Sequence, residues 1–239
     1  MSPTSADSAW NAQESWSGTS RHGSARQETP GLGTKWGETH DSSVRNSDFT
    51  RASGSPTATT SVYYNNHAGS SGSGWRGRQP FSIGSVATIG IRSKSGFGGY
   101  LPGSSSGGRN SVVGSEGQRY AIQIKNLTGA RLEVVLSVDG LDVIDGKGAS
   151  YGKRGYLVDP YGNLEVDGFR KNYSEVAAFR FSGVDASYAA KRHGDTRNVG
   201  VIGAAVFHER GSDPYSHRGH ANPFPGEGPD GRFATPPGR

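Results

Sequence analysis

The chain of 239 residues contains no cysteine. Disulfide bonds, thiolate metal sites, a cysteine nucleophile and a lipidated cysteine are therefore excluded. Long apolar runs are also missing, so the sequence predicts no membrane span. The N-terminus, MSPTSADSAWNAQESWSG, has no basic start and no apolar stretch, which argues against a classical secretory signal. Localisation is left open between the cytoplasm and export by a non-classical route.

Apolar residues and clustered charge are scarce as well. Hydrophobic residues make up 31% of the chain and 38 residues are glycine, whereas ordinary globular domains have about 45–50% apolar residues with glycine included. Such a composition predicts a folded part joined to low-complexity segments. The net charge of +5 is small and spread along the chain, without the basic cluster that phosphate neutralisation requires. Nucleic acid is therefore disfavoured as a partner.

Composition divides the chain into five segments. Residues 1–29 are rich in serine and predict a disordered arm. Residues 117–209 contain most of the strand-like apolar runs and predict the folded β-sandwich domain. The other segments are extended or strand segments at 30–67, whose packing on the core is left open, a Gly/Ser-rich insertion or linker at 68–116, and a disordered Pro/Gly-rich tail at 210–239.

Strand-like alternation dominates residues 117–209. In RYAIQIKN, Tyr120, Ile122 and Ile124 alternate with less apolar residues, which is the period of a half-buried strand. RLEVVLSV repeats the pattern, Asp139 and Gly140 suit a hairpin turn, and VGVIGAAVF predicts a central strand covered on both faces. About seven short strands at spacings of about ten residues predict an all-β fold, either an antiparallel β-sandwich or a small barrel. Only ASYAAKRHG suggests a helical turn.

Several phrases of the chain resemble a family of uncharacterised bacterial proteins. They are PGLGTKWGE and SVYYNNHAG near the N-terminus, and SVDGLDVIDGKGASYGKRGYLVDPYGNLEVDGFR and GDTRNVGVIGAAVFHER in the strand-rich region. The similarity spans residues 30–67 and 117–210. It implies that the N-terminal phrases and the strand-rich region belong to one β unit, and it implies no particular activity.

Three aspartates, Asp139, Asp142 and Asp145, lie in the phrase VDGLDVIDGKG. Carboxylate oxygens in a glycine-containing loop are ligands that calcium accepts. The EF-hand loop, however, needs acidic or amide residues at alternate positions, where this sequence has Leu141 and Val143. The sequence thus predicts no cofactor, with a weak calcium site as the alternative. Without calcium, Asp139 and Asp145 are expected to open turns through side-chain hydrogen bonds.

Isolated aromatic residues and one polar cluster are the candidates for contact with a partner or a glycan. Aromatic rings in Gly-rich or turn-rich segments either stack on a ligand or dock the segment onto the domain. The aromatic candidates are Trp36, Trp75, Tyr151, Tyr156, Tyr161 and Tyr173. The polar cluster is Asp195, Arg197 and Asn198 in GDTRNVG, and structural pairing is expected of it because a charge beside a buried strand needs a partner.

No set of catalytic residues stands out in the sequence, which favours a non-enzymatic structural or interaction protein. Such a protein would bind a protein partner or self-assemble, for example in a cell-surface structure, filament or particle. A carbohydrate-binding β-sandwich module is the first alternative, with the tyrosines as its contact residues. A hydrolase of unknown substrate is the second, and it requires Ser or Asp beside His193 or His208 in a polar pocket.

Overall fold

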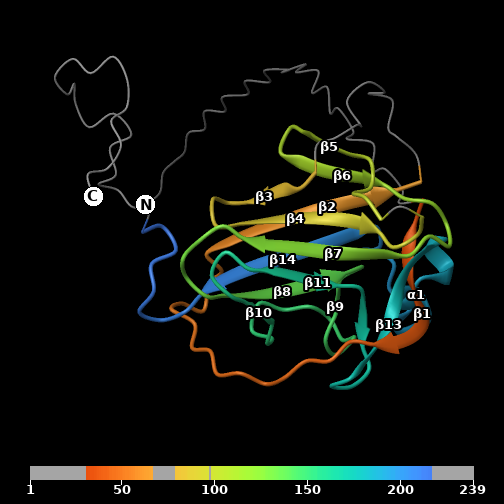
Figure 1. The fold of residues 1–239 in the computed structure, drawn as a ribbon. Helices are drawn as coiled ribbons and strands as arrows, with labels where there is room; N and C mark the ends of the chain where they lie inside the picture. Colours follow the sequence, from red (N-terminus) through yellow and green to blue (C-terminus); the bar gives the residue numbers. More distant parts are fainter. Residues whose placement is uncertain (1–30, 67–78, 97, 217–239) are drawn as a thin grey trace, which may run out of the picture.

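The computed structural model describes residues 31–66, 79–96 and 98–216. This part of the chain contains fourteen strands, one short α-helix and one 3-10 turn (Figure 1). The all-β fold expected from the alternating pattern is thereby confirmed. The arm predicted at 1–29, the residue Trp75 and the tail beyond residue 216 lie outside the described residues.

The largest sheet has seven strands in the order β10-β8-β14-β2-β6-β5, with β9 paired to β8. Ala204 of β14 lies between Leu136 of β8 and Thr60 of β2, and both pairings are antiparallel. The pairing of β2 with β6 is parallel, which departs from the wholly antiparallel arrangement expected. The strands are β2 (Ala58–Asn65), β5 (Gly103–Ser106), β6 (Arg109–Val113), β8 (Leu132–Val138), β9 (Leu141–Asp142), β10 (Tyr156–Val158) and β14 (Val201–His208).

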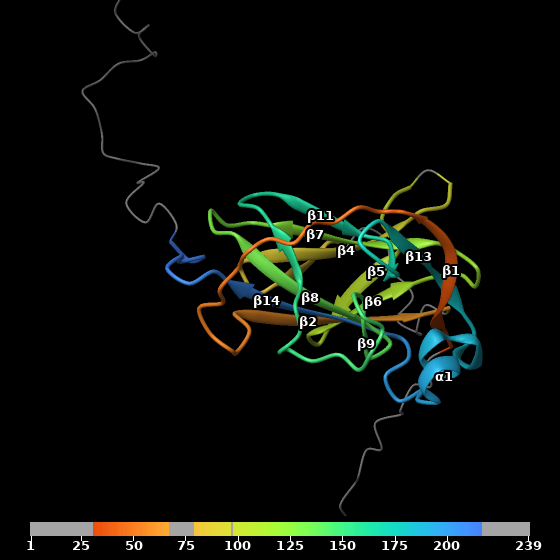
Figure 2. The same cartoon turned by 90° about the horizontal axis from the view of Figure 1, so that it is seen from below.

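A four-stranded sheet forms the second layer, in the order β11-β7-β4-β3. Figure 2 shows it lying over the seven-stranded sheet, so the architecture is a two-layered sandwich. Ile89, Ile122 and Ile124 are completely buried, because every second side chain of a strand in such a sheet faces the core. The strands are β3 (Phe81–Ile83), β4 (Ala87–Ser93), β7 (Tyr120–Asn126) and β11 (Asn163–Val166).

A three-stranded sheet, β1-β13-β12, stands at one end of the sandwich (Figure 2). It is followed by the 3-10 turn η1 (Val184–Ala186) and by α1 (Tyr188–His193), which confirms the expected helical turn. Ser187 caps the start of α1 by accepting a hydrogen bond from the backbone nitrogen of Ala190, and Gly194 ends the helix in the left-handed conformation. The strands are β1 (Gly33–Asp41), β12 (Gly168–Arg170) and β13 (Glu175–Ser182).

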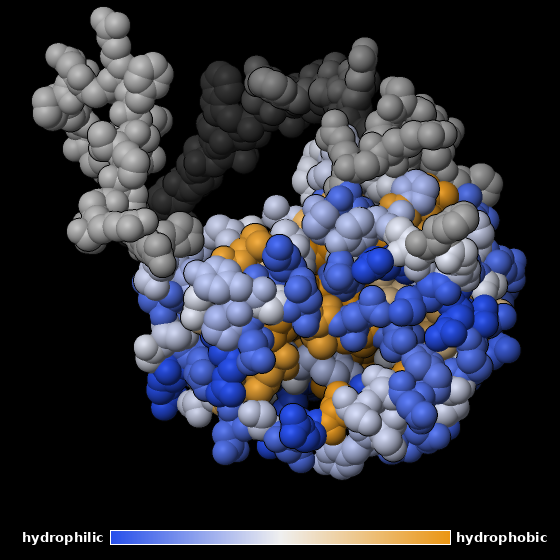
Figure 3. All heavy atoms as spheres, viewed as in Figure 1, coloured by the Kyte–Doolittle hydropathy of each residue, from blue (hydrophilic) through white to orange (hydrophobic). Residues whose placement is uncertain are grey.

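One hydrophobic cluster connects the three sheets. Its end nearest β1 is filled by aromatic rings: Tyr120 stacks on Phe181 with ring centroids 4.4 Å apart, and Phe169 meets Phe179 edge-on at 5.1 Å. Burial of this apolar surface provides the main driving force for folding. Figure 3 shows the side of the molecule seen in Figure 1, where hydrophilic residues cover most of the surface and apolar residues appear in narrow strips.

Both halves of the described chain build the sandwich. Residues 117–209 supply eight strands, β7 to β14, of which β9 has two residues, close to the seven expected. Strands β1 and β2, which come from the segment 30–67, pair with β13 and β14 and so pack on the core. The segment 68–116, expected as an insertion or linker, supplies β3 to β6 because Phe81, Ile83, Ile89 and Ile91 are buried in the core.

Candidate functional site

A groove of about 710 Å³ lies on the outer face of the seven-stranded sheet. Its floor is formed by outward-facing side chains of three adjacent strands: Thr59, Ser61 and Tyr63 of β2, Val201, Gly203 and Ala205 of β14, and Val135 and Ser137 of β8. The positions between them, such as Val62, Leu136 and Ile202, are buried in the core. The alternation that builds the core therefore also builds the groove floor.

Small residues make this face hollow. Gly203 pairs with Ser61 on one side and with Ser137 on the other, so no large side chain fills the middle of the floor. A Cβ atom placed on Gly203 would lie 2.6 Å from the Ser137 hydroxyl oxygen. A glycine at this position lets a ligand approach the sheet backbone closely.

Arg109 lies just outside the groove on its β2 side, against Tyr63 of the floor. The guanidinium carbon of Arg109 lies 4.0 Å from the centre of the Tyr63 ring, in a cation–π arrangement. Gly107 and Gly108, at the turn between β5 and β6, line a second hollow of about 390 Å³ together with Arg109. The second hollow shares four residues of β2 with the groove, so the two hollows adjoin.

The wall on the β8 side is the loop that carries Tyr151, and Arg51 holds this loop in place. The Arg51 guanidinium donates hydrogen bonds to the carbonyl of Tyr151 and, at 2.5 Å, to the carbonyl of Lys153. It also forms an ion pair of 2.6 Å with the buried Glu133 and lies 3.7 Å from the centre of the Phe207 ring. Arg51 thus covers the apolar end of the outer face and positions Tyr151 at the groove.

A buried carboxylate lies beside the end of the groove, at the turn that follows β8. Asp139 accepts hydrogen bonds from the backbone nitrogens of Thr34, at 2.7 Å, and Gly200, at 2.9 Å, and from the Tyr64 hydroxyl. The Thr34 hydroxyl bonds in turn to the hydroxyls of Tyr64 and Tyr120, at 2.7 and 2.6 Å. This Asp139 network ties β1, β2, β7 and the start of β14 to the turn after β8.

Burial changes the titration of the Asp139 network. Loss of hydration raises the pKa of Asp139 to about 6, against the lowering effect of its hydrogen-bond donors. The pKa values of Tyr64 and Tyr120 are raised well above their usual range, first by burial and then by the neighbouring Asp139 carboxylate. Both tyrosines are therefore neutral hydroxyl groups throughout the physiological pH range.

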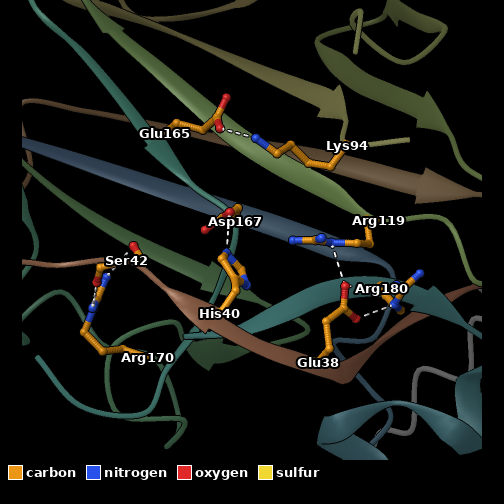
Figure 4. A network of polar contacts seen from close by, with 9 residues as sticks. All are labelled: Glu38, His40, Ser42, Lys94, Arg119, Glu165, Asp167, Arg170 and Arg180. Carbon is orange, nitrogen blue, oxygen red and sulfur yellow. Dashed lines mark hydrogen bonds and ion pairs between the residues drawn. The ribbon is translucent and has the colours of Figure 1, made fainter. Parts of the chain in front are cut away.

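A set of ion pairs covers another part of the surface, around the three-stranded sheet (Figure 4). Glu38 accepts hydrogen bonds from Arg180 at 2.8 and 2.9 Å and forms an ion pair of 3.0 Å with Arg119. The hydrogen bonds from Arg180 hold the pKa of Glu38 at about 2. Figure 4 also shows His40 pointing toward Asp167, with 2.6 Å between Nε2 and Oδ2. Because these carboxylates are already paired, we assign the ion pairs to the cohesion of the sheets.

The exposed tyrosines predicted as contact residues lie on different segments. Tyr151 is 55% exposed and lines the groove. Tyr161 and Tyr173 are 67% and 65% exposed, but Tyr161 faces Gly129 at the turn between β7 and β8, and the Tyr173 hydroxyl accepts a hydrogen bond from Asn46. Of these three tyrosines, only Tyr151 lines the groove.

Two other predicted aromatic residues take part in packing. The hydroxyl of the half-buried Tyr156 accepts a hydrogen bond of 3.0 Å from Arg170. Trp36 is 39% exposed; its ring stacks on Phe169 and packs at a tilt against Tyr188, with ring centroids 6.0 and 4.9 Å away. Neither lines the groove.

The predicted polar cluster lies at the end of the groove. Asp195 and Arg197 form an ion pair of 2.9 Å, and this pairing holds the pKa of Asp195 at about 2. Asn198 packs so closely on Gly140 that a Cβ on the glycine would lie 2.8 Å from the Cβ of Asn198. Arg197 and Asn198 both line the groove, so the cluster combines the expected pairing with a place in the site.

The three aspartates considered for calcium point toward different partners. Asp139 belongs to the buried network. Asp142 accepts hydrogen bonds from the backbone nitrogens of Ile144 and Asp145 at 2.9 and 3.0 Å, while Asp145 binds Lys153 Nζ at 2.6 Å. Within residues 31–66, 79–96 and 98–216, no group of three or more His, Cys, Asp or Glu side chains is arranged to hold a metal ion.

The groove itself was not predicted. Its floor residues carried no motif, and the small outward residues on three strands form a floor only once the strand pairing is known.

Family models, curated proteins and solved structures provide no match to this chain. The resemblance drawn from its phrases therefore stays a prediction. Among the described residues there is no helix with the length and apolarity needed to cross a membrane.

Proposed function

We propose that the protein is a non-catalytic carbohydrate-binding protein, with the groove on the outer sheet face as its binding site. The observation that carries this proposal is the chemistry of the groove lining. It presents the hydroxyls of serine, threonine and tyrosine together with the Asn198 amide and the Arg197 guanidinium. These groups donate and accept hydrogen bonds in the manner that sugar hydroxyls need.

Aromatic rings supply the apolar part of the site. Tyr151 is exposed at the β8 side of the groove, and Tyr63 stands at the β2 side. The C–H face of a sugar ring packs on an aromatic ring as other apolar groups do. The hollow floor at Gly203 leaves space for a saccharide between the two tyrosines, and mixed polar and apolar walls of this kind are typical of small-ligand sites.

The groove favours this function over the two other hypotheses from the sequence. Assembly by strand addition needs a long open edge. The sheet that carries the groove ends in the short strands β5 and β10, of four and three residues, so the groove is no part of such an edge, and the long edge strand β1, of nine residues, belongs to the three-stranded sheet. Hydrolysis needs an acid–base group, and the groove lining contains no Asp, Glu or His. His193 and His208 bond instead to the Gly146 carbonyl and to the Thr57 hydroxyl. A non-enzymatic role and the place in the cell stay predictions.

A glycan and polysaccharide array tests the proposal with the full chain, followed by calorimetric titration of the best ligand. We expect Tyr151→Ala to weaken binding about fivefold, because one lost aromatic contact costs about 1 kcal/mol. Tyr173→Ala is the matched control, since Tyr173 is similarly exposed but lies outside the groove. Equal losses in the two variants, or no glycan bound by the folded protein, would contradict the proposal.

A further inference from the structure

The Asp139 network lies directly behind the lining of the groove. Gly140, Val201 and Tyr63 all line the groove. Each is the chain neighbour of a network member: Gly140 follows Asp139, Val201 follows Gly200 and Tyr63 precedes Tyr64. The Asp139 backbone nitrogen also donates to the Val201 carbonyl at 2.9 Å. The network members that bond to the Asp139 carboxylate are therefore one residue away from the groove lining.

The Asp139 carboxylate is surrounded by hydrogen-bond donors. Oδ2 accepts from the Thr34 nitrogen, while Oδ1 accepts from both the Gly200 nitrogen and the Tyr64 hydroxyl. The titratable groups that face it are Tyr64 from β2 and, through Thr34, Tyr120 from β7. Neither tyrosine ionises near neutral pH, so protonation of this network occurs at Asp139.

We propose that Asp139 is a positioning residue for the groove: its ionised form fixes the groove end formed by Gly140, Asn198 and Val201, and its protonation releases that end and weakens ligand binding. The part that concerns ligand affinity rests on the proposed carbohydrate-binding function. The part that concerns the position of the groove end stands without it.

Hydrogen-bond balance gives the reason. A protonated carboxyl oxygen becomes a donor and a much weaker acceptor. Protonation at Oδ1 lets Asp139 donate to the Tyr64 oxygen and weakens the bond from the Gly200 nitrogen; protonation at Oδ2 weakens the bond from the Thr34 nitrogen. Either event loosens one backbone segment of the network. Because burial raises the pKa of Asp139 to about 6, the change falls in a pH range that is readily measured.

Nuclear magnetic resonance of the full chain tests the positioning without any ligand. The Asp139 carboxyl carbon and the amide groups of Gly140, Asn198 and Val201 are followed from pH 4 to pH 8. We expect one common midpoint. Tyr64→Phe removes a donor that stabilises the ionised form, so the common midpoint moves upward. The inference is overturned if the amide signals of the groove do not titrate with the midpoint of Asp139. It is also overturned if their midpoint stays unchanged when that of Asp139 moves in Tyr64→Phe.

Titration of the best array glycan at pH 7.5 and pH 5 tests the effect on affinity. We expect about a fivefold loss at pH 5 in the native protein, the lower range of typical coupling between two sites, and no pH dependence in Asp139→Asn. Asparagine tolerates the positive φ of 55° at this position. Equal affinity at both pH values, with Asp139 titrating between them, overturns the inference and leaves the proposed function intact. Absence of any glycan binding while the groove amides titrate refutes the proposed function alone.

Discussion

The contact between β1 and the core includes the buried hydroxyl of Thr34, which can be replaced by a methyl group without much change in the shape of the side chain. Thr34 is completely buried, and its hydroxyl bridges the hydroxyls of Tyr64 and Tyr120. Thr34→Val replaces this hydroxyl with a methyl group. The Tyr64 hydroxyl keeps its bond to Asp139, whereas Thr34 is the one hydrogen-bond partner recorded for the Tyr120 hydroxyl among the described residues.

The cost of the substitution follows from this difference. A buried hydroxyl left without a partner costs about 1–3 kcal/mol, so Thr34→Val should lower the free energy of unfolding by about 2 kcal/mol. Tyr120→Phe alone should cost about 1 kcal/mol, because the Thr34 hydroxyl keeps its bond to Tyr64. In the double variant the unpaired hydroxyl is gone, so the cost of the double variant should be about 1 kcal/mol smaller than the sum of the two single costs.

Urea unfolding monitored by the fluorescence of Trp36 provides the assay, since Trp36 packs against Phe169 and Tyr188 at the same end of the core. The other tryptophans are replaced by phenylalanine in all four proteins, so that the signal reports this end alone. Costs that add to within about 0.5 kcal/mol would show that the two residues act independently. That result would refute the claim that the hydroxyl network holds β1 on the core.

Three further perturbations test other parts of the structure. Burial raises the pKa of Asp139 from 3.8 to about 6, so its contribution to stability is present below pH 4 and is lost as the pH rises through 6. Over this range the free energy of unfolding in urea should fall by about 3 kcal/mol in the native protein relative to Asp139→Asn. A rise in the free energy of unfolding over the same range would contradict the sign. Gly114→Ala places a Cβ 2.4 Å from the ring of Phe181 and should cost about 1–3 kcal/mol in thermal unfolding, whereas Gly183→Ala, with no atom within 4 Å of the new Cβ, should cost almost nothing; similar losses would disagree with the packing described. Arg51→Ala leaves Glu133 buried without its ion pair and should lower the free energy of unfolding by about 3 kcal/mol in chemical denaturation. Adding Glu133→Gln removes the unpaired charge and should reduce this loss. No recovery in the double variant would show that lost packing is the cause.

The strands of the core could be predicted where local alternation decides which side chains face inward. Leu132, Val134 and Leu136 were expected on one face of a strand, and all three are buried in β8. The pattern could not show the parallel pairing of β2 with β6, because that pairing depends on residues far apart in the sequence. Residues 81–91 fell within the segment expected as an insertion or linker, because their alternation is interrupted by the turn between β3 and β4.

The groove and the Asp139 network were out of reach of the sequence for two physical reasons. The run VGVIGAAVF was expected to be covered on both faces, yet the outer face of β14 is covered by Arg51 at Phe207 and hollow at Gly203. Hydropathy records that a residue is apolar and not how much space it fills. Asp139 does occupy the expected tight turn, but its carboxylate binds Thr34, which lies 105 positions away in the sequence. Local turn rules cannot reveal such a distant partner.

The most direct test of the central claim fills the groove floor. Gly203→Leu places a large side chain between Ser61 and Ser137, where the backbone conformation accepts any residue and the neighbouring Ser137 hydroxyl can rotate away. Gly183→Leu is the control, in a place where an added Cβ meets no atom within 4 Å. Calorimetric titration with the best array glycan should show at least about a tenfold loss of affinity in Gly203→Leu and native affinity in Gly183→Leu. Native affinity in a folded Gly203→Leu protein would contradict binding in this groove.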